Sequence, residues 1–242
     1  MTLVLRSVAL TDRGLVRRAN QDAVYAGTRL LAVADGMGGM AAGDLASEIT
    51  IQAVAAADAD HPEAALVDAM RAVIAAAGAR IRAAVAEDPT RDGMGTTLTA
   101  LLFAPGNTAV TLAHVGDSRA YLHRDGVTQQ MTKDDTFVQM LVDEGVITPD
   151  EASVHPRRAV VTQALQGEPV EPAFSTMTPL AGDRWLICSD GLSNVVREDT
   201  IQDVLRTHPD RGTCAARLVD LARRAGGPDN ITVIVADLEE SA

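Results

Sequence analysis

The sequence contains few aromatic side chains and no excess of basic ones. Only 2% of the 242 residues are Phe, Trp or Tyr, which argues against a stacking surface for bases or sugars. The 33 acidic residues outnumber the 21 basic ones, so the net charge is −12 and the pI is near 4.7. Such a chain lacks the basic patch that nucleic acids and anionic membranes require. We therefore expect neither a nucleic-acid partner nor a membrane partner.

Cysteine is also scarce. Cys188 and Cys214 lie in apolar surroundings without C-x-x-C spacing, which is typical of a reduced, cytoplasmic protein. The first residues contain no apolar segment long enough for a signal peptide. A stretch without charged side chains runs from Gly93 to Gly116, but Pro105-Gly106-Asn107 interrupts it. This pattern indicates two strands joined by a turn rather than a transmembrane helix.

Aspartate, by contrast, is in surplus, with 23 Asp against 10 Glu. Helix surfaces favour Glu, whereas turns, helix caps and metal sites favour Asp. The surplus of Asp therefore makes the positions of these carboxylates informative. The length and the 47% apolar content are sufficient for a large core. No repeat or low-complexity linker divides the chain, and we therefore expect residues 1–242 to form a single domain.

The order of the expected elements indicates an α+β fold. Strands are predicted near 3–10 and 30–34, and helices between 41 and 60 and over 63–87, where apolar residues recur at helical spacing. Further strands are expected at 96–103, 108–115, 119–123, 127–131, 174–177, 184–188 and 231–238, and helices at 199–206 and 212–225. Because strands and helices occur in separate runs, antiparallel sheets are favoured over a doubly wound parallel sheet.

Residues 132–172 differ from their surroundings. A short apolar helix closed by Gly145 is followed by Thr148-Pro149-Asp150-Glu151, a capping box with Pro at the first helical position. We interpret this segment as a small helical insertion that lies over the sheet edges.

Three apolar runs end in an aspartate, and a fourth aspartate precedes the last predicted strand: Asp35, Asp117, Asp190 and Asp229. Strand ends meet at the edge of a sheet, so these carboxylates are expected to converge. Mg²⁺ or Mn²⁺ would relieve their repulsion, because both ions prefer oxygen ligands. Each aspartate taken alone is better explained as a turn cap. The Asp-Gly pairs after two buried runs favour the metal site, since Gly36 lets its carbonyl approach a cation.

Six short motifs occur in a fixed order along the chain. They are Arg17-x-x-Asn20-Gln21-Asp22, Asp35-Gly36-Met37-Gly38-Gly39, Gly95-Thr96-Thr97, Val115-Gly116-Asp117-Ser118-Arg119, Ser189-Asp190-Gly191 and Asp229-Asn230. Together they resemble the metal-dependent serine/threonine protein phosphatases of the type 2C family, in its compact bacterial form, from about residue 17 to residue 235. The resemblance implies a four-layer α/β/β/α sandwich, with two central antiparallel sheets between helix pairs. It also makes residues 132–172 a mobile flap.

The resemblance implies metal ligands at the matching positions. Asp35 would bridge two Mn²⁺ or Mg²⁺ ions, and the carbonyl of Gly36 would bind one of them. Asp190 and Asp229 would bind the other ion. Asp117, together with Asp190, would form a third metal site.

The resemblance also implies a reaction. Asp22 would orient water molecules and Arg17 would bind the substrate phosphate with its planar guanidinium, although Arg18 is an alternative for this role. Two metal ions lower the pKa of a shared water, which would then attack phosphorus in line. The expected enzyme is a cytoplasmic monomer that hydrolyses phosphoserine and phosphothreonine in proteins and opposes a serine/threonine kinase.

The chain departs from the family pattern at several positions. Met37 stands where many members have a histidine proposed to protonate the leaving group, and Gln21 replaces a frequent glutamate. Asp134-Asp135-Thr136 replaces Asp-His-Ser at the start of the flap, so substrate preference is expected to differ. His114 stands where asparagine is common, and we interpret it as a packed or hydrogen-bonded residue on a strand rather than a ligand.

Two hypotheses from other functional classes were weighed against the enzyme. A non-catalytic phosphoprotein-binding module would not need the clustered Asp35, Asp190 and Asp229. A structural metal-binding domain would not need Arg17 beside Asn20-Gln21-Asp22. The sequence therefore favours the active phosphatase.

Overall fold

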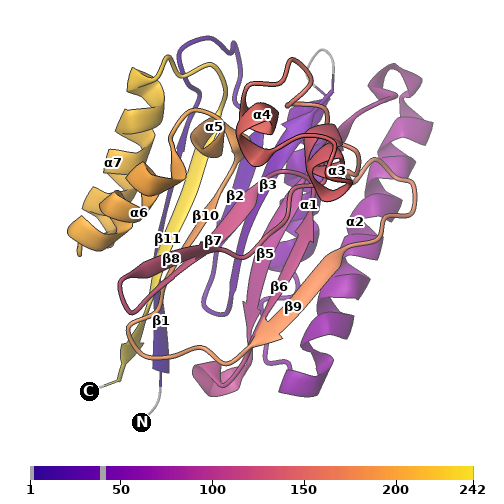
Figure 1. Cartoon of the computed structure of the whole chain (residues 1–242). Coiled ribbons are helices and arrows are strands. Elements are labelled where there is room, and N and C mark those ends of the chain that lie inside the picture. The colour runs from indigo at the N-terminus through magenta and orange to yellow at the C-terminus, as the bar shows by residue number, and fades with distance from the viewer. Residues whose placement is uncertain (1–2, 39–41, 242) are drawn as a thin grey trace.

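The computed structural model describes residues 3–38 and 42–241. Two antiparallel sheets pack face to face, and helices cover the outer face of each sheet (Figure 1). The four-layer α/β/β/α sandwich expected from the sequence is therefore confirmed.

The first sheet joins both ends of the chain. Its strand order is β1 (Leu3–Asp12), β11 (Ile231–Glu240), β10 (Arg184–Cys188), β7 (Arg119–Arg124) and β8 (Val127–Gln130). β1 and β11 pair from Leu3 opposite Glu240 to Asp12 opposite Ile231. Asp125 and Gly126 connect β7 to β8 with positive φ angles of 52° and 80°. This turn confirms the predicted hairpin, because a two-residue turn of this kind requires positive φ at both positions.

The second sheet begins with a strand that the sequence analysis missed. Its order is β2 (Asp22–Ala26), β3 (Leu30–Met37), β5 (Leu98–Phe103), β6 (Val110–Val115) and β9 (Ala173–Met177), and β4 (Gly95–Thr96) pairs with the end of β3. The residues of β2 are half-buried or exposed and the strand is short, so it shows no clear alternation of apolar and polar side chains.

The helices cover the sheets in pairs. α1 (Gly43–Ala55) and α2 (Leu66–Glu87), which follows the 3₁₀ turn η1 (Glu63–Ala65), lie on the second sheet, whereas α6 (Glu198–Thr207) and α7 (Arg211–Arg224) lie on the first (Figure 1). All four helices were predicted. The expected start at residue 41 lies outside the described residues, and residues 56–60 are not helical because α1 ends at Ala55.

Shorter elements complete the connections. η2 (Pro89–Arg91) follows α2, η3 (Pro105–Asn107) forms the predicted turn between β5 and β6, and α5 (Asp190–Ser193) begins directly after β10. No helix in the described part of the chain is both long enough and apolar enough to cross a membrane.

Three apolar cores separate the four layers. Leu30, Met70 and Leu98 belong to the core between the second sheet and its helices. Neighbouring strand residues face opposite sides of a sheet, so Trp185 points into the core between the sheets and Leu186 into the core against α6 and α7. These cores hold both sheets rigidly, and the ends of their strands therefore have fixed relative positions.

Residues 132–172 lie at one end of the sandwich. They contain α3 (Phe137–Asp143) and α4 (Pro149–Ser153), and Thr148 and Glu151 form the predicted capping box. Single bridges join Thr96 to Leu165 and Thr136 to Val161, close to the two ends of the segment. In Figure 1 both helices lie at the same end of the sheets as α5.

The core between the sheets should dominate stability. Leu101 is fully buried there, so Leu101→Ala is expected to lower the free energy of unfolding by about 2–5 kcal/mol, because truncation leaves a cavity. Val127→Ala is the matched control, since Val127 is 64% exposed. Denaturant titration measures both variants. Equal losses from the two substitutions would contradict the assignment of Leu101 to the core.

Candidate metal and phosphate site

Five aspartates from separate segments meet at one end of the sandwich. Asp22 lies directly opposite Asp35 in the β2–β3 pair. Asp117 follows β6, Asp190 begins α5 after β10, and Asp229 lies two residues before β11. One local expectation was wrong, because Asp35 lies inside β3 rather than at its end. The strand continues to Met37, where β4 pairs with it.

Backbone hydrogen bonds fix the position of Asp35. Its amide donates to Oγ1 of Thr97 over 3.0 Å, and its carbonyl accepts from the amide of Thr97 and from Oγ1 of Thr96, each over 2.9 Å. These contacts give the motif Gly95-Thr96-Thr97 a physical role. Thr96 and Thr97 position the segment that presents the Asp35 carboxylate.

Two fully buried carboxylate oxygens in the cluster have no hydrogen-bond partner in the part of the chain that the structure describes. Oδ2 of Asp22 accepts a hydrogen bond of 2.8 Å from Ser189, and Oδ2 of Asp190 accepts one of 2.9 Å from Asn194. The other oxygen of each aspartate, Oδ1, is buried without a hydrogen-bond partner among the described residues. A buried polar atom without a partner is costly, so these oxygens are suited to a ligand that carries positive charge or donates hydrogen bonds.

Burial and mutual repulsion raise the pKa values of the cluster. Burial, together with repulsion from Asp229, raises the pKa of Asp22 and of Asp190 to about 6. Burial is also the main cause that raises the pKa of Asp117 to about 8, with repulsion from Asp190 and Asp134. The pKa of Asp35 lies well above its usual value, because the group is buried and faces the other four carboxylates.

Arg17 lies against this cluster. Its Nη2 donates to Oδ2 of Asp229 over 2.6 Å, and this hydrogen bond raises the pKa of Arg17, with further attraction to Asp190 and Asp35. Arg18 is exposed, and in the described structure its side chain forms no ion pair. The geometry therefore brings Arg17, and not Arg18, to the carboxylates.

Asn230 is a site residue whose role the sequence did not reveal. It is 4% exposed, and its Nδ2 donates to the carbonyls of Arg13 and Ala19 over 3.0 and 2.9 Å. Its Oδ1 accepts from the amide of Gln21 over 2.8 Å. Asn230 thus holds both ends of the loop that carries Arg17. The Asp229-Asn230 motif signalled the residue, but only the fold shows what it contacts.

Asp117 is accompanied by a half-buried ion pair that was also not anticipated. Arg119 binds Asp134 through Nε and Nη2, over 2.9 and 2.7 Å to its nearest oxygens. Asp135 accepts from the amide of Gly116 over 2.9 Å, and its own amide donates to the Gly116 carbonyl over 2.7 Å. The start of segment 132–172 is thereby attached to the turn that presents Asp117.

The glycine at position 36 is required for packing. A Cβ there would lie 2.1 Å from the carbonyl oxygen of Gly43 and 2.5 Å from that of Gln21. Backbone carbonyls of Gly43 and Gln21 therefore approach Gly36 closely, where β3 meets the start of α1.

His114 is 2% exposed and contacts Oγ1 of Thr99 and the carbonyl of Lys133. Its interpretation as a packed, hydrogen-bonded residue is confirmed.

The donor set fits hard divalent cations. In the described residues, no three His, Cys, Asp or Glu side chains are arranged so that they alone could hold a metal ion. Mg²⁺ binds proteins through one or two carboxylates and retains several waters, so a closed cage of side chains is not required. The unpartnered oxygens of Asp22 and Asp190 and the raised pKa values describe a site that added positive charge would stabilise.

The model of the protein phosphatase 2C family matches residues 16–221. The chain belongs to the protein phosphatase 2C family. It is 55% identical over 238 residues to the serine/threonine protein phosphatase PstP of Mycobacterium tuberculosis, and it spans about half of that protein's length (46%). It is 36% identical to protein phosphatase PhpP of Streptococcus pneumoniae and covers 96% of each chain.

Solved structures of this family share the whole fold. A crystal structure of PstP from M. tuberculosis has a TM-score of 0.95 and 54% sequence identity, covering 98% of this chain and all of that one. A structure of the PstP catalytic domain in complex with two manganese ions has a TM-score of 0.92 and 52% identity, with 99% and 100% coverage. The family model, which matches residues 16–221, covers Arg17, Asp22, Asp35, Asp117 and Asp190 of the phosphatase 2C site. Asp229 lies beyond the matched residues.

A cleft lies between the phosphatase 2C site and segment 132–172. Its volume is about 630 Å³, and it is lined by Asp117 and Arg119 from the sheets, by Thr136 and Gln139 from segment 132–172, and by Asn194 after α5. Most of the side chains that line the cleft are polar or charged, which suits a stretch of polypeptide better than a small apolar ligand.

The raised pKa values predict how stability depends on pH. Each acid has a higher pKa in the folded protein than in the unfolded chain, so its stabilising contribution is present below about pH 4 and is lost as pH rises through its folded pKa. Without metal, the melting temperature is expected to fall between pH 5.5 and pH 8, because Asp22, Asp190 and Asp117 titrate in this window.

Mn²⁺ should therefore stabilise the protein more at pH 8 than at pH 5.5, by roughly 5 °C in melting temperature, because it replaces protons at the same oxygens. Differential scanning fluorimetry with EDTA or Mn²⁺ measures both effects. Asp190→Asn should flatten the metal-free pH dependence. A melting temperature in EDTA that is flat or rises over this range would contradict the assignment.

Proposed function

We propose that the chain is a Mn²⁺- or Mg²⁺-dependent phosphatase that hydrolyses phosphoserine and phosphothreonine in proteins. The observation that carries the proposal is the convergence of five aspartates beside the guanidinium of Arg17, with one buried oxygen each of Asp22 and Asp190 lacking a partner among the described residues. Family membership supports the proposal, since the relatives named above are serine/threonine phosphatases.

In this proposal two cations are held by Asp35, the carbonyl of Gly36, Asp190 and Asp229. The manganese-bound structure of the PstP catalytic domain supports two ions of this kind. When bound, they supply positive charge that activates a water for attack on phosphorus and offsets charge on the phosphoryl oxygens. The chain's contribution is to hold these oxygens at a rigid junction of two sheets, so that little rearrangement is needed.

Arg17 and Asp22 have separate tasks in this proposal. The guanidinium of Arg17 binds two phosphate oxygens with its parallel N–H groups, in exchange for its contact with Asp229. Asp22 orients water through Oδ1, while Ser189 holds its other oxygen. Met37 carries no dissociable proton, so the leaving alkoxide takes its proton from water.

We further propose a third cation site at Asp117 with Asp190. Repulsion from Asp190 contributes to the raised pKa of Asp117, which supports a shared site. The Arg119–Asp134 pair neutralises the neighbouring carboxylate of Asp134, leaving Asp117 as the acid available to the ion.

The wider setting follows from the same proposal. Residues 1–242 act as one catalytic domain, a monomer, with residues 132–172 as a flap over the cleft. Its partners are phosphorylated proteins and the serine/threonine kinase that it opposes. Cys188 and Cys214 are both buried and free, and burial raises their thiol pKa values, which suits a reducing cytoplasm.

The activity has a direct test. Purified protein with Mn²⁺ should hydrolyse an aryl phosphate and a phosphothreonine peptide, and EDTA should abolish both. Asp35→Asn keeps the shape of the side chain but removes its charge, and should lower kcat by about a thousandfold or more. Folded wild-type protein without Mn²⁺-dependent turnover would refute the enzyme and favour a phosphoprotein-binding module.

The third site is tested separately. Asp117→Ala should lower kcat while two Mn²⁺ ions still bind, because Asp35, Asp190 and Asp229 are unchanged. Isothermal titration calorimetry counts the bound ions, and Asp68→Asn, at an exposed aspartate on α2, is the comparison variant. If Asp117→Ala removes all metal binding, the separation of the sites is wrong.

A further inference from the structure

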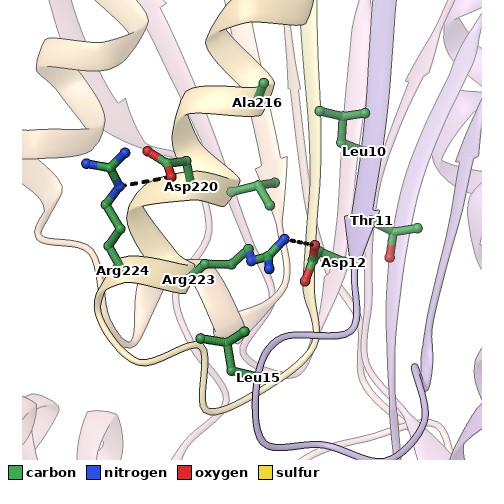
Figure 2. Close-up of a pocket in the computed structure, with 9 residues that line it drawn as sticks. Leu10, Thr11, Asp12, Leu15, Ala216, Asp220, Arg223 and Arg224 are labelled. Atoms are coloured by element: carbon green, nitrogen blue, oxygen red, sulfur yellow. Dashed lines mark hydrogen bonds and ion pairs between the residues drawn. The ribbon is translucent and has the colours of Figure 1, made fainter.

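A groove lies beside the site, between β1 and the end of α7 (Figure 2). Its volume is about 530 Å³. Leu10, Leu15 and Val219 give it an apolar wall, and Asp220, Arg223 and Arg224 carry its charges. We call it the α7 groove. Its position matters because one wall is formed by the loop of residues 13–20, which also carries Arg17.

This loop is packed tightly against the segment after α7. The amide of Leu15 donates to the carbonyl of Gly227 over 2.8 Å. A Cβ on Gly14, whose φ is +73°, would lie 2.1 Å from the carbonyl oxygen of Asp229. Leu15 and Arg17 are two residues apart, which an extended chain spans in about 7 Å. A peptide whose phosphate reaches Arg17 can therefore place a neighbouring residue at the α7 groove.

The loop is basic although the whole chain is strongly acidic. It carries Arg13, Arg17 and Arg18 and contains no acidic residue, whereas the net charge of the chain is −12. Arg13 and Arg18 are exposed, and neither forms an ion pair within the described structure. Between them, Leu15 and Val16 are 58% and 68% exposed. The loop thus offers unpaired positive charge on both sides of an apolar surface.

The acids of the groove do not cancel this charge. Asp12 already binds Arg223 over 3.0 Å, and Asp220 binds Arg217 and Arg224 over 2.8 and 2.9 Å. These neighbours neutralise both carboxylates. The charge that remains available to a ligand is therefore positive.

We propose that the α7 groove and the exposed Arg13 and Arg18 form a docking surface for an acidic segment of the phosphoprotein substrate. An apolar side chain about two to four residues from the phosphorylated residue enters the groove, and flanking Asp or Glu residues pair with Arg13 and Arg18. This proposal rests on the phosphatase activity proposed above and adds a substrate class to it. The net charge of the chain is −12, so an acidic peptide is repelled by most of the molecule. The basic loop therefore determines in which orientation the peptide approaches the site.

The test uses three phosphothreonine peptides that share one apolar residue and differ only in their flanking residues, which are Glu, Gln or Lys. Mn²⁺-dependent kcat/KM is measured for each peptide. Binding is measured separately, by fluorescence anisotropy in EDTA, so that no turnover occurs. The wild type should favour the Glu peptide over the Gln peptide by about three- to tenfold, and this preference should shrink at high salt.

The double variant Arg13→Glu/Arg18→Glu should lose the preference for the Glu peptide or reverse it. Leu15→Ser should weaken binding of all three peptides, because the apolar contact does not depend on charge. Arg80→Glu is the matched control: Arg80 is exposed on α2, forms no ion pair in the described structure, and should keep the wild-type preference. Melting temperatures establish that each variant is folded.

Several outcomes would overturn the proposal. One is equal affinity of the wild type for the Glu and Gln peptides; another is a double variant that keeps the preference. A third is that the wild type shows no peptide preference but sediments with phosphatidylserine vesicles, and that the double variant sediments less. That result would assign the surface to a membrane instead. If the wild type hydrolyses none of the peptides, the proposed phosphatase activity is refuted. The anisotropy measurement still tests the docking surface, because it does not depend on turnover.

Discussion

Repulsion between buried carboxylates is the constraint around which this molecule is arranged. Asp22, Asp35, Asp117, Asp190 and Asp229 lie close enough that each of the first four has a raised pKa, with burial as the main cause. Isolated strand ends would move apart under this repulsion. Three separate apolar cores prevent the movement, because they fix both sheets and their helices. The energy of packing is thus used to hold charges where a divalent cation can bind.

The same junction determines where the guanidinium of Arg17 lies. Asn230 follows a proposed metal ligand directly and holds both ends of the loop that presents Arg17. A single two-residue motif therefore positions a carboxylate and, through the loop, the guanidinium that faces it. This coupling explains why the ion pair between Arg17 and Asp229 joins residues 212 positions apart in the chain.

The surroundings of the site are different on its two sides. The cleft towards segment 132–172 is polar and carries Asp117 and Asp134, whereas the loop on the other side carries Arg13 and Arg18 and an apolar groove. The cleft is lined by arginines, such as Arg119 and Arg158, as well as by acids, whereas the loop carries no acidic residue. Asp135, which stands where the family commonly has a histidine, also has a structural role. Its carboxylate accepts a hydrogen bond from the amide of Gly116, directly beside Asp117.

Much of the fold could be predicted because its signals are local. Helical spacing over 63–87, the Asp125-Gly126 turn and the capping box at Thr148 depend on neighbouring residues, and each was found where the sequence placed it. The half-buried strand β2 was missed, since five residues of mixed burial carry no periodic signal. The ordered motifs identified the family and named the acids, because aspartate and glycine in this order are rare by chance. The contacts of Asn230, the choice of Arg17 over Arg18 and the orphaned oxygens of Asp22 and Asp190 were decided only by the tertiary structure. These features depend on distances between segments more than two hundred residues apart, which packing sets and no local pattern records.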